Sequence, residues 1–103
     1  MVKFDVLHDL VVDWAAQRRI IPNSTPLAQA SKTIEEVAEL VSAINRQSRA
    51  EMQDAYGDIF VTLIIGSKCA GFDLLECLGN AYDEIKDRTG HLRPDGVFVK
   101  DAP

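Results

Sequence analysis

Three glutamates crowd one segment of the chain with little positive charge to balance them. Glu35, Glu36 and Glu39 fall in the stretch TIEEVAELVSAI, whose apolar residues recur at helical spacing. Only Lys32 offers a positive charge on the same wedge of the predicted helix. Because like charges three or four residues apart on a helix repel one another, this group is either a solvated helix face or one half of a cation site.

A second acidic group lies in the stretch EMQDAYGDIFVTLI. Glu51, Asp54 and Asp58 are spaced by three and four residues, so they share one helix face. One and two turns further on, the same face carries Val61 and Ile65. Since a fully solvated face would not continue into valine and isoleucine, we expect these acids to stand at the entrance to the core.

Carboxylates that are buried close together need compensation. They can be protonated, paired with basic groups or bound to a cation. Two acidic helix faces favour a cation, and oxygen ligands without His or Cys favour Mg²⁺ or Mn²⁺ over Zn²⁺. The residues alone therefore predict a divalent-metal site, with an ordinary solvated surface as the alternative.

The apolar spacing predicts four helices that position these acids. They run roughly over Phe4 to Arg19, Pro26 to Gln47, Arg49 to Ala70 and Asp73 to Arg88. After Gly90 we expect an extended tail with a turn at Asp95-Gly96. These elements predict an all-α fold, in which a four-helix bundle-type domain spans residues 1–103 and ends in an extended C-terminal tail.

Two apolar patterns define the predicted core. The helix that carries the glutamates has a stripe apart from its acidic wedge, made of Ile34, Val37, Ala38, Val41 and Ile44. The next helix is apolar almost all round from Ile59 to Ile65, which is typical of burial on several sides. The β-branched residues there are compatible with a strand, but continuity with the preceding acidic segment favours a helix.

The composition narrows the class of protein. The net charge of -5 argues against binding to a nucleic-acid polymer or to an anionic membrane. The longest apolar run, Ile59 to Gly66, is too short to cross a bilayer. With no signal peptide visible, we expect a cytoplasmic location. Cys69 and Cys77 are interpreted as buried free thiols, and His8 and His91 as ordinary core or surface residues.

With these motifs, the chain resembles the MazG-like family of all-α nucleoside triphosphate pyrophosphohydrolases. That family carries an E-E-x-x-E motif on one helix and an E-x-x-D motif on the next, and both ligate Mg²⁺. The first motif is intact at Glu35 to Glu39. The resemblance extends roughly from Trp14 to Lys100 and includes WAAQRR, KTIEEVAEL, DAYGDIFVTLI and AYDEIKDRTG. The closing GVFVK resembles the tail of small phage-type or mobile-element members.

The second motif departs from the family pattern. Anchoring it on Gly57-Asp58 puts Ala55 where the family has glutamate. Asp54 can substitute, since residues four apart share a helix face. The alternative, EMQD from Glu51 to Asp54, matches the residue types of E-x-x-D but places the motif one helical turn earlier. We prefer Asp54 and Asp58, with Glu51 supporting them from outside, and the sequence leaves the choice between Glu51 and Asp54 open.

The resemblance implies hydrolysis of a ribo- or deoxyribonucleoside triphosphate to the monophosphate and pyrophosphate. Mg²⁺, or Mn²⁺ in its place, would be held by Glu36, Glu39, Asp54 and Asp58. Either Glu35 or Glu39 would orient or deprotonate the attacking water. The implied catalytic residues are therefore Glu35, Glu36, Glu39 and Asp58.

Basic residues should complete the site for the triphosphate. The family has basic residues in a place comparable to Lys86 and Arg88, although cations at helix C-termini are common for other reasons. Lys32 either contacts phosphate or relieves the acidic wedge.

The base and sugar need their own contacts. Trp14, with Arg18 on the same helix face, is the best candidate for the base, and the alternative is that Trp14 belongs to the core. Asp83 replaces an asparagine common in the family, and it or Asn80 would contact the sugar.

Assembly is expected, because family members pair their helices as homodimers or homotetramers with sites near the interface. The main alternative is a non-catalytic helical module that binds nucleotide or protein and keeps the fold. A ferritin-like di-iron bundle is disfavoured because it requires Glu-x-x-His pairs, which the chain lacks.

Overall fold

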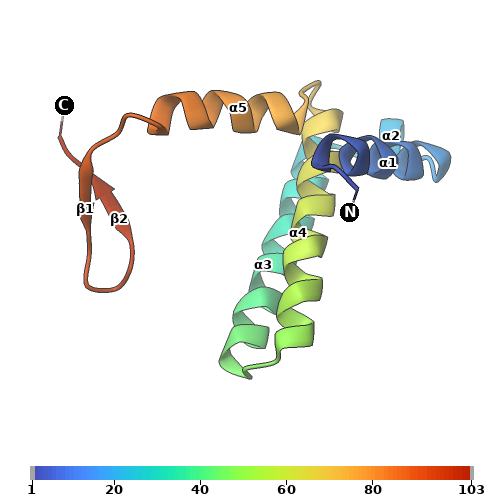
Figure 1. Ribbon diagram of the computed structural model, residues 1–103. Helices are drawn as coiled ribbons and strands as arrows, with labels where there is room; N and C mark the ends of the chain where they lie inside the picture. The colour runs from blue at the N-terminus through green and yellow to red at the C-terminus, as the bar shows by residue number, and fades with distance from the viewer. Residues whose placement is uncertain (1, 103) are drawn as a thin grey trace.

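The computed structural model describes residues 2–102 and is mostly helical (Figure 1). Its elements are α1 (Phe4–Gln17), α2 (Ile20–Asn23), α3 (Pro26–Asn45), α4 (Arg49–Cys69), α5 (Leu74–Ile85), β1 (Gly90–Leu92) and β2 (Phe98–Lys100). The four long helices lie where the apolar spacing predicts them, and the helical class of the fold is confirmed. Within this part of the chain, no helix is long and apolar enough to cross a membrane.

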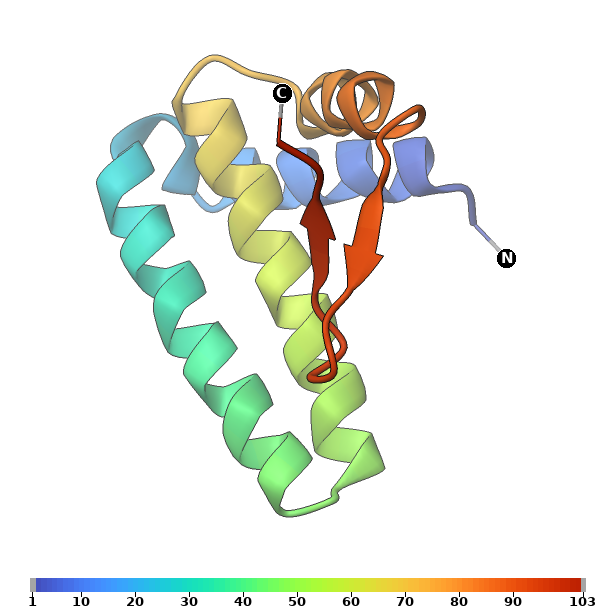
Figure 2. The same ribbon diagram turned by 90° about the vertical axis from the view of Figure 1, so that its left-hand side faces the viewer.

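The helices α3 and α4 form an antiparallel pair that both views show side by side (Figures 1 and 2). Each begins with a side-chain cap, since Thr25 Oγ1 accepts from Ala28 N–H at 3.0 Å and Ser48 caps α4 in the same way. Thr33 Oγ1 donates to Thr62 Oγ1 at 2.8 Å, which fixes the register of the pair. The pairing sets the two acidic groups of the sequence opposite each other.

The helix α1 crosses the C-terminal half of α4 (Figure 1). Phe4 and Phe60 meet edge to face with ring centroids 5.8 Å apart. Ala15 is fully buried on the inner side of α1. α1 therefore lies beside the half of α4 that follows the acidic group.

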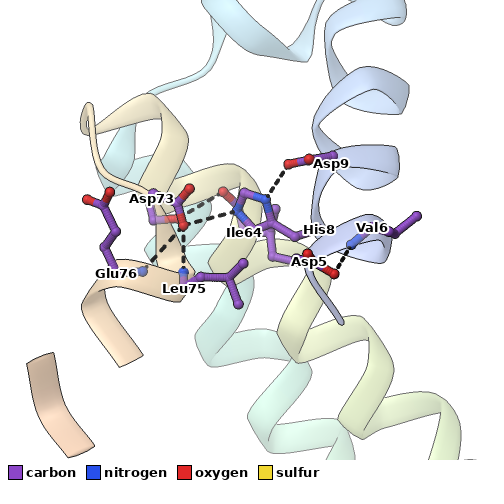
Figure 3. A network of polar contacts seen from close by, with 9 residues as sticks. Asp5, Val6, His8, Asp9, Ile64, Asp73, Leu75 and Glu76 are labelled. Carbon is purple, nitrogen blue, oxygen red and sulfur yellow. Dashed lines mark hydrogen bonds and ion pairs between the residues drawn. The ribbon is translucent and has the colours of Figure 1, made fainter. Parts of the chain in front are cut away.

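The start of α5 is joined to α1 by a polar network (Figure 3). His8 is only 2% exposed, and its Nδ1 lies 3.1 Å from Asp9 Oδ1. Its Nε2 lies 4.0 Å from Asp73 Oδ1, the oxygen that accepts from Leu75 N–H at 2.8 Å. The interpretation of His8 as a core residue is confirmed, and Asp73 is the N-cap of α5.

The predicted extended tail is wrong in its detail, because residues 90–100 form an antiparallel hairpin. Gly90 pairs with Lys100 and Leu92 with Phe98. The turn is present, with Gly96 at φ 90° and its N–H bonded to the Arg93 carbonyl. Gly90 is required, since a Cβ there would lie 2.2 Å from the Val99 carbonyl oxygen. Strands this short leave little periodicity in a sequence.

The helices do not close into one bundle within a single chain. The arm, which we define as residues 74–102, stands clear of most of α3 and α4 (Figures 1 and 2). The radius of gyration is 16.0 Å, whereas a compact domain of this size has about 13 Å.

Much of the predicted core stripe is therefore exposed. On α3, Ile34 is 70% exposed and Val41 52%, and on α5, Tyr82 is 60% exposed. The expectation that this stripe is buried is wrong for the single chain, because no other element within residues 2–102 covers it. The two cysteines are free as predicted, but neither is buried, since Cys69 is half-buried and Cys77 is exposed.

Candidate functional site

A cavity of about 340 Å³ opens between α3 and α4, and we call it the acidic cavity. It is lined by Glu39, Ser42, Arg46, Glu51, Asp54, Ala55 and Asp58. The pairing of α3 and α4 thus places Glu39, from the first acidic group, at the same cavity as all three acids of the second group. Within residues 2–102, the side chains of Glu39, Asp54 and Asp58 make no hydrogen bond or ion pair. Their oxygens are free to act as ligands.

Glu36 lies one turn before Glu39 and is buried, with 7% of its surface exposed. Its Oε1 lies 3.7 Å from Lys32 Nζ, but its Oε2 is buried without a hydrogen-bond partner. A carboxylate oxygen left in this state is unfavourable unless a cation compensates it.

The donor set fits a hard divalent cation. The candidate ligands supply only carboxylate oxygens, which Mg²⁺ and Mn²⁺ prefer, and the unpaired Glu36 oxygen lies at the same helix pair. Among residues 2–102, no three His, Cys, Asp or Glu side chains converge tightly enough to hold an ion as they stand.

Glu51 differs from the other acids of the cavity because it already has a basic partner. Arg46 donates to Glu51 Oε2 through one guanidinium nitrogen and to Ser42 Oγ through another. The hydrogen bond from Arg46, and then its positive charge, hold the pKa of Glu51 below its usual value. The structure leaves Asp54 unpaired and Glu51 paired.

Glu35 and Lys32 lie outside the acidic cavity. The Glu35 side chain is 67% exposed and its Oε2 lies 3.4 Å from Lys32 Nζ. Hydrogen bonding to Glu35, together with the charges of Glu35 and Glu36, raises the pKa of Lys32 above its usual value. In the single chain, Lys32 thus pairs with two acids of the wedge.

A second, largely apolar cavity of about 410 Å³ lies between α1 and α4, and we call it the apolar cavity. It is lined by Leu7, Leu10, Val11, Trp14, Asp58 and Val61. Trp14 is 44% exposed, and the Arg18 guanidinium lies 4.5 Å from the centre of its ring. Trp14 and Arg18 are thus together, as the sequence predicts, and Asp58 lines both cavities.

The predicted contacts on α5 are not brought to either cavity in the single chain. Lys86 Nζ lies 3.4 Å from Asp83 Oδ1. Arg88 and Asp83 instead line a separate surface cavity with residues of the tail. Asn80 is exposed on α5. The arm stands apart from most of α3 and α4 (Figure 1), and none of its residues lines the acidic cavity.

Arg46 is a site residue that sequence reasoning missed. The signal was available, because Arg46 follows Glu39 and Ser42 at i+7 and i+4, on the same face of α3.

Comparison with known proteins gives three findings. A family model described as the MazG nucleotide pyrophosphohydrolase domain matches residues 24–93. An uncharacterised 18.2 kDa protein from the rep-hol intergenic region of Haemophilus phage HP1 (strain HP1c1) is 34% identical over 58 residues. The match covers 56% of this chain but only 36% of that protein.

The third finding is structural. The fold superimposes with a TM-score of 0.75 on the cyanophage S-2L MazG-like pyrophosphohydrolase, which was solved bound to dGDP and three catalytic Mn²⁺ ions per active site. The match covers 99% of this chain and 96% of the other, at 17% identity. At that identity, the likeness shows a shared fold.

Proposed function

The chain belongs to the MazG nucleotide pyrophosphohydrolase family, and on that premise we propose that it hydrolyses a nucleoside triphosphate to the monophosphate and pyrophosphate with Mg²⁺. The observation that carries the proposal is that Asp58 lines both the acidic and the apolar cavity. A nucleotide placed across Asp58 would have its phosphates among metal-binding carboxylates and its base in an apolar site. Such division of polar and apolar contacts is typical of nucleotide sites.

The metal ligands in this proposal are Glu36, Glu39, Asp54 and Asp58. The buried, unpaired oxygen of Glu36 and the unpaired carboxylates of the acidic cavity support the choice. When bound, the ions supply the positive charge that lets a triphosphate enter an acidic site and that polarises the anhydride bond. The Mn²⁺ ions in the cyanophage relative support divalent-metal dependence.

Glu39 is favoured over Glu35 as the group that orients the attacking water and accepts its proton. Glu39 lines the acidic cavity, whereas Glu35 is exposed and pairs with Lys32. A general base must lie within hydrogen-bond reach of the proton that it removes.

The base would occupy the apolar cavity against Trp14. The Arg18 guanidinium over the indole ring holds the ring in place from one side. The dGDP of the cyanophage relative supports a nucleotide ligand for this fold.

Assembly as a homodimer or homotetramer is part of the proposal. The exposed apolar side chains of α3 and α5 and the large radius of gyration support it. In such an assembly, the arm can carry Lys86, Arg88 and Asp83 to a neighbouring copy's substrate. A cytoplasmic location, where nucleoside triphosphates are available, agrees with this function.

A non-catalytic nucleotide-binding or interaction module is the second candidate. One specific observation favours it, because Ala55 stands in the cavity where the family pattern has glutamate. Asp54, one residue earlier and unpaired, is the proposed replacement.

The test is a panel of ribo- and deoxyribonucleoside triphosphates incubated with the protein and Mg²⁺, with products resolved by ion-exchange chromatography. The proposal expects pyrophosphate and monophosphate in equal amounts, since attack at the α-phosphorus releases both. Release of orthophosphate and diphosphate would contradict the proposed reaction. Nucleotide binding without any product at micromolar enzyme would favour the non-catalytic module.

A further inference from the structure

We propose that Arg46 binds the β- and γ-phosphates of the substrate, and that Glu51 is the counter-ion of Arg46 rather than a metal ligand. The inference rests on the proposed function, and it assigns the residue that binds the outer phosphates in the same site. Of the residues that line the acidic cavity, Arg46 alone is basic. Its place at the C-cap of α3 would suit any cation, but its guanidinium also faces the acidic cavity.

The position of Arg46 along the helix pair corresponds to the far end of a triphosphate. Asp58 marks the junction with the apolar cavity, and Glu51 lies seven residues earlier on α4. At a rise of about 1.5 Å per residue, this separation is about 10 Å. A substrate whose base lies beside Trp14 therefore extends its phosphate chain past Asp58 and Asp54 toward Arg46.

The guanidinium keeps donors free for a phosphate. It uses one nitrogen for Ser42 Oγ and another for Glu51, whereas an arginine has five N–H donors. The Arg46 side chain is 55% exposed, so solvent and ligand can reach it. Arginine matches phosphate oxygens in a two-pronged geometry that lysine cannot reproduce.

Charge balance explains why Glu51 accompanies Arg46. Without substrate, Glu51 neutralises the guanidinium beside the metal-binding carboxylates. When substrate enters, its phosphate oxygens compete with Glu51 for the same donors. A carboxylate already engaged by arginine is a poor choice for a cation ligand, whereas the unpaired Asp54 is available.

The experiment measures binding of pyrophosphate, of a nucleoside monophosphate and of Mn²⁺ by titration calorimetry. The variants are Arg46→Gln, Arg46→Lys and Glu51→Gln, with Arg49→Gln as matched control because Arg49 is exposed at the start of α4 and lies outside the acidic cavity. Pyrophosphate and monophosphate are titrated in the presence of Mg²⁺, and Mn²⁺ is titrated without nucleotide.

We expect Arg46→Gln to weaken pyrophosphate binding by about tenfold or more, as for the loss of charge-assisted hydrogen bonds. Monophosphate binding and Mn²⁺ affinity should not weaken in this variant. Arg46→Lys should fall between Arg46→Gln and the original protein, and Arg49→Gln should match the original. Glu51→Gln should bind pyrophosphate at least as tightly and keep its Mn²⁺ affinity.

Unchanged pyrophosphate binding in Arg46→Gln, or no pyrophosphate binding by the original protein, would overturn the role of Arg46. A tenfold loss of Mn²⁺ affinity in Glu51→Gln would make Glu51 a metal ligand. If Arg46→Gln does not fold, as judged by circular dichroism, the comparison of Arg46→Lys with the original protein decides the question. These binding results do not depend on turnover, so they stand apart from a failure to hydrolyse triphosphates.

Discussion

Trp14 on α1 and Asp58 on α4 line the same apolar cavity, and Asp58 also lines the acidic cavity between α3 and α4. The aromatic ring and the carboxylate come from two helices that cross each other (Figure 1), and Asp58 is the lining residue that the two cavities share. Under the proposed function, this arrangement would separate recognition of a base from recognition of phosphates. The two can therefore be tested with different ligands.

Replacing Trp14 with alanine should weaken nucleotide binding by roughly tenfold, because a stacking surface for the base is lost. Binding of inorganic tripolyphosphate should not change, since it has no base. Calorimetric titration of both ligands in the presence of Mg²⁺ measures the difference. If the variant bound the nucleotide and tripolyphosphate equally less tightly, Trp14 would have a structural role and would not contact the base.

The glutamates of the first motif should separate into two functional classes. Glu39→Gln should lower kcat by about a hundredfold or more, because it would remove a proposed metal ligand and the favoured general base. Glu35→Gln, the matched control, should stay within a few fold of the original, since Glu35 is exposed and pairs with Lys32. Steady-state release of pyrophosphate measures both. If kcat fell equally in the two variants, Glu35 would also take part in catalysis.

Glu36→Gln should stabilise the metal-free protein, because the change removes a buried charge whose Oε2 has no partner. The expected gain is about 1 kcal/mol in the free energy of unfolding. The same change should abolish the rise in Tm that Mn²⁺ produces in the original protein through preferential binding to the folded state. Thermal unfolding with and without Mn²⁺ gives both quantities. A variant that is destabilised yet still responds to Mn²⁺ would exclude Glu36 as a ligand.

The Arg46–Glu51 pair predicts a loss of stability in acid. Arg46 lowers the pKa of Glu51 below the reference value of 4.5, so the folded state binds this proton less tightly than the unfolded state. The stabilisation is therefore present above pH 4.5 and is lost as the pH falls through the lowered pKa. In thermal unfolding between about pH 3 and pH 6, the stability of Glu51→Gln should not show this part of the pH dependence. An identical pH profile in the two proteins would mean that the pair does not form in solution.

Sequence reasoning located features that depend on local spacing. The long helices and the intact motif at Glu35 to Glu39 both follow from residues a few positions apart. The pairing of Glu51 with Arg46 was not predicted, because it depends on how the loop between α3 and α4 sets two side chains against each other.

The exposure of Ile34 and Val41 was not predicted for a different reason. An apolar stripe indicates that a surface will be covered, but it does not say whether the cover comes from the same chain. The hairpin after Gly90 was missed because each of its strands is only three residues long.

The exposed apolar stripe of α3 predicts that the protein assembles with other copies of itself. Ile34, Val37 and Val41 are 70%, 42% and 52% exposed, and they recur at i, i+3 and i+7 on one face. Contiguous apolar surface of this kind is typical of a helix that packs against another subunit. We therefore expect the original protein to have a mass in solution of two or four times 11.4 kDa.

Val41→Glu should shift that mass toward the single chain, because a charge would be buried at the interface. Val2→Glu is the matched control, since it introduces the same charge at a valine that is 49% exposed before α1. Sedimentation equilibrium across a range of concentrations measures both variants. If Lys86 and Arg88 act on a neighbouring copy's substrate, dissociation by Val41→Glu should also weaken triphosphate binding. A protein that is already a single chain at micromolar concentration, or a Val41→Glu variant that remains assembled, would show that this stripe is not the interface.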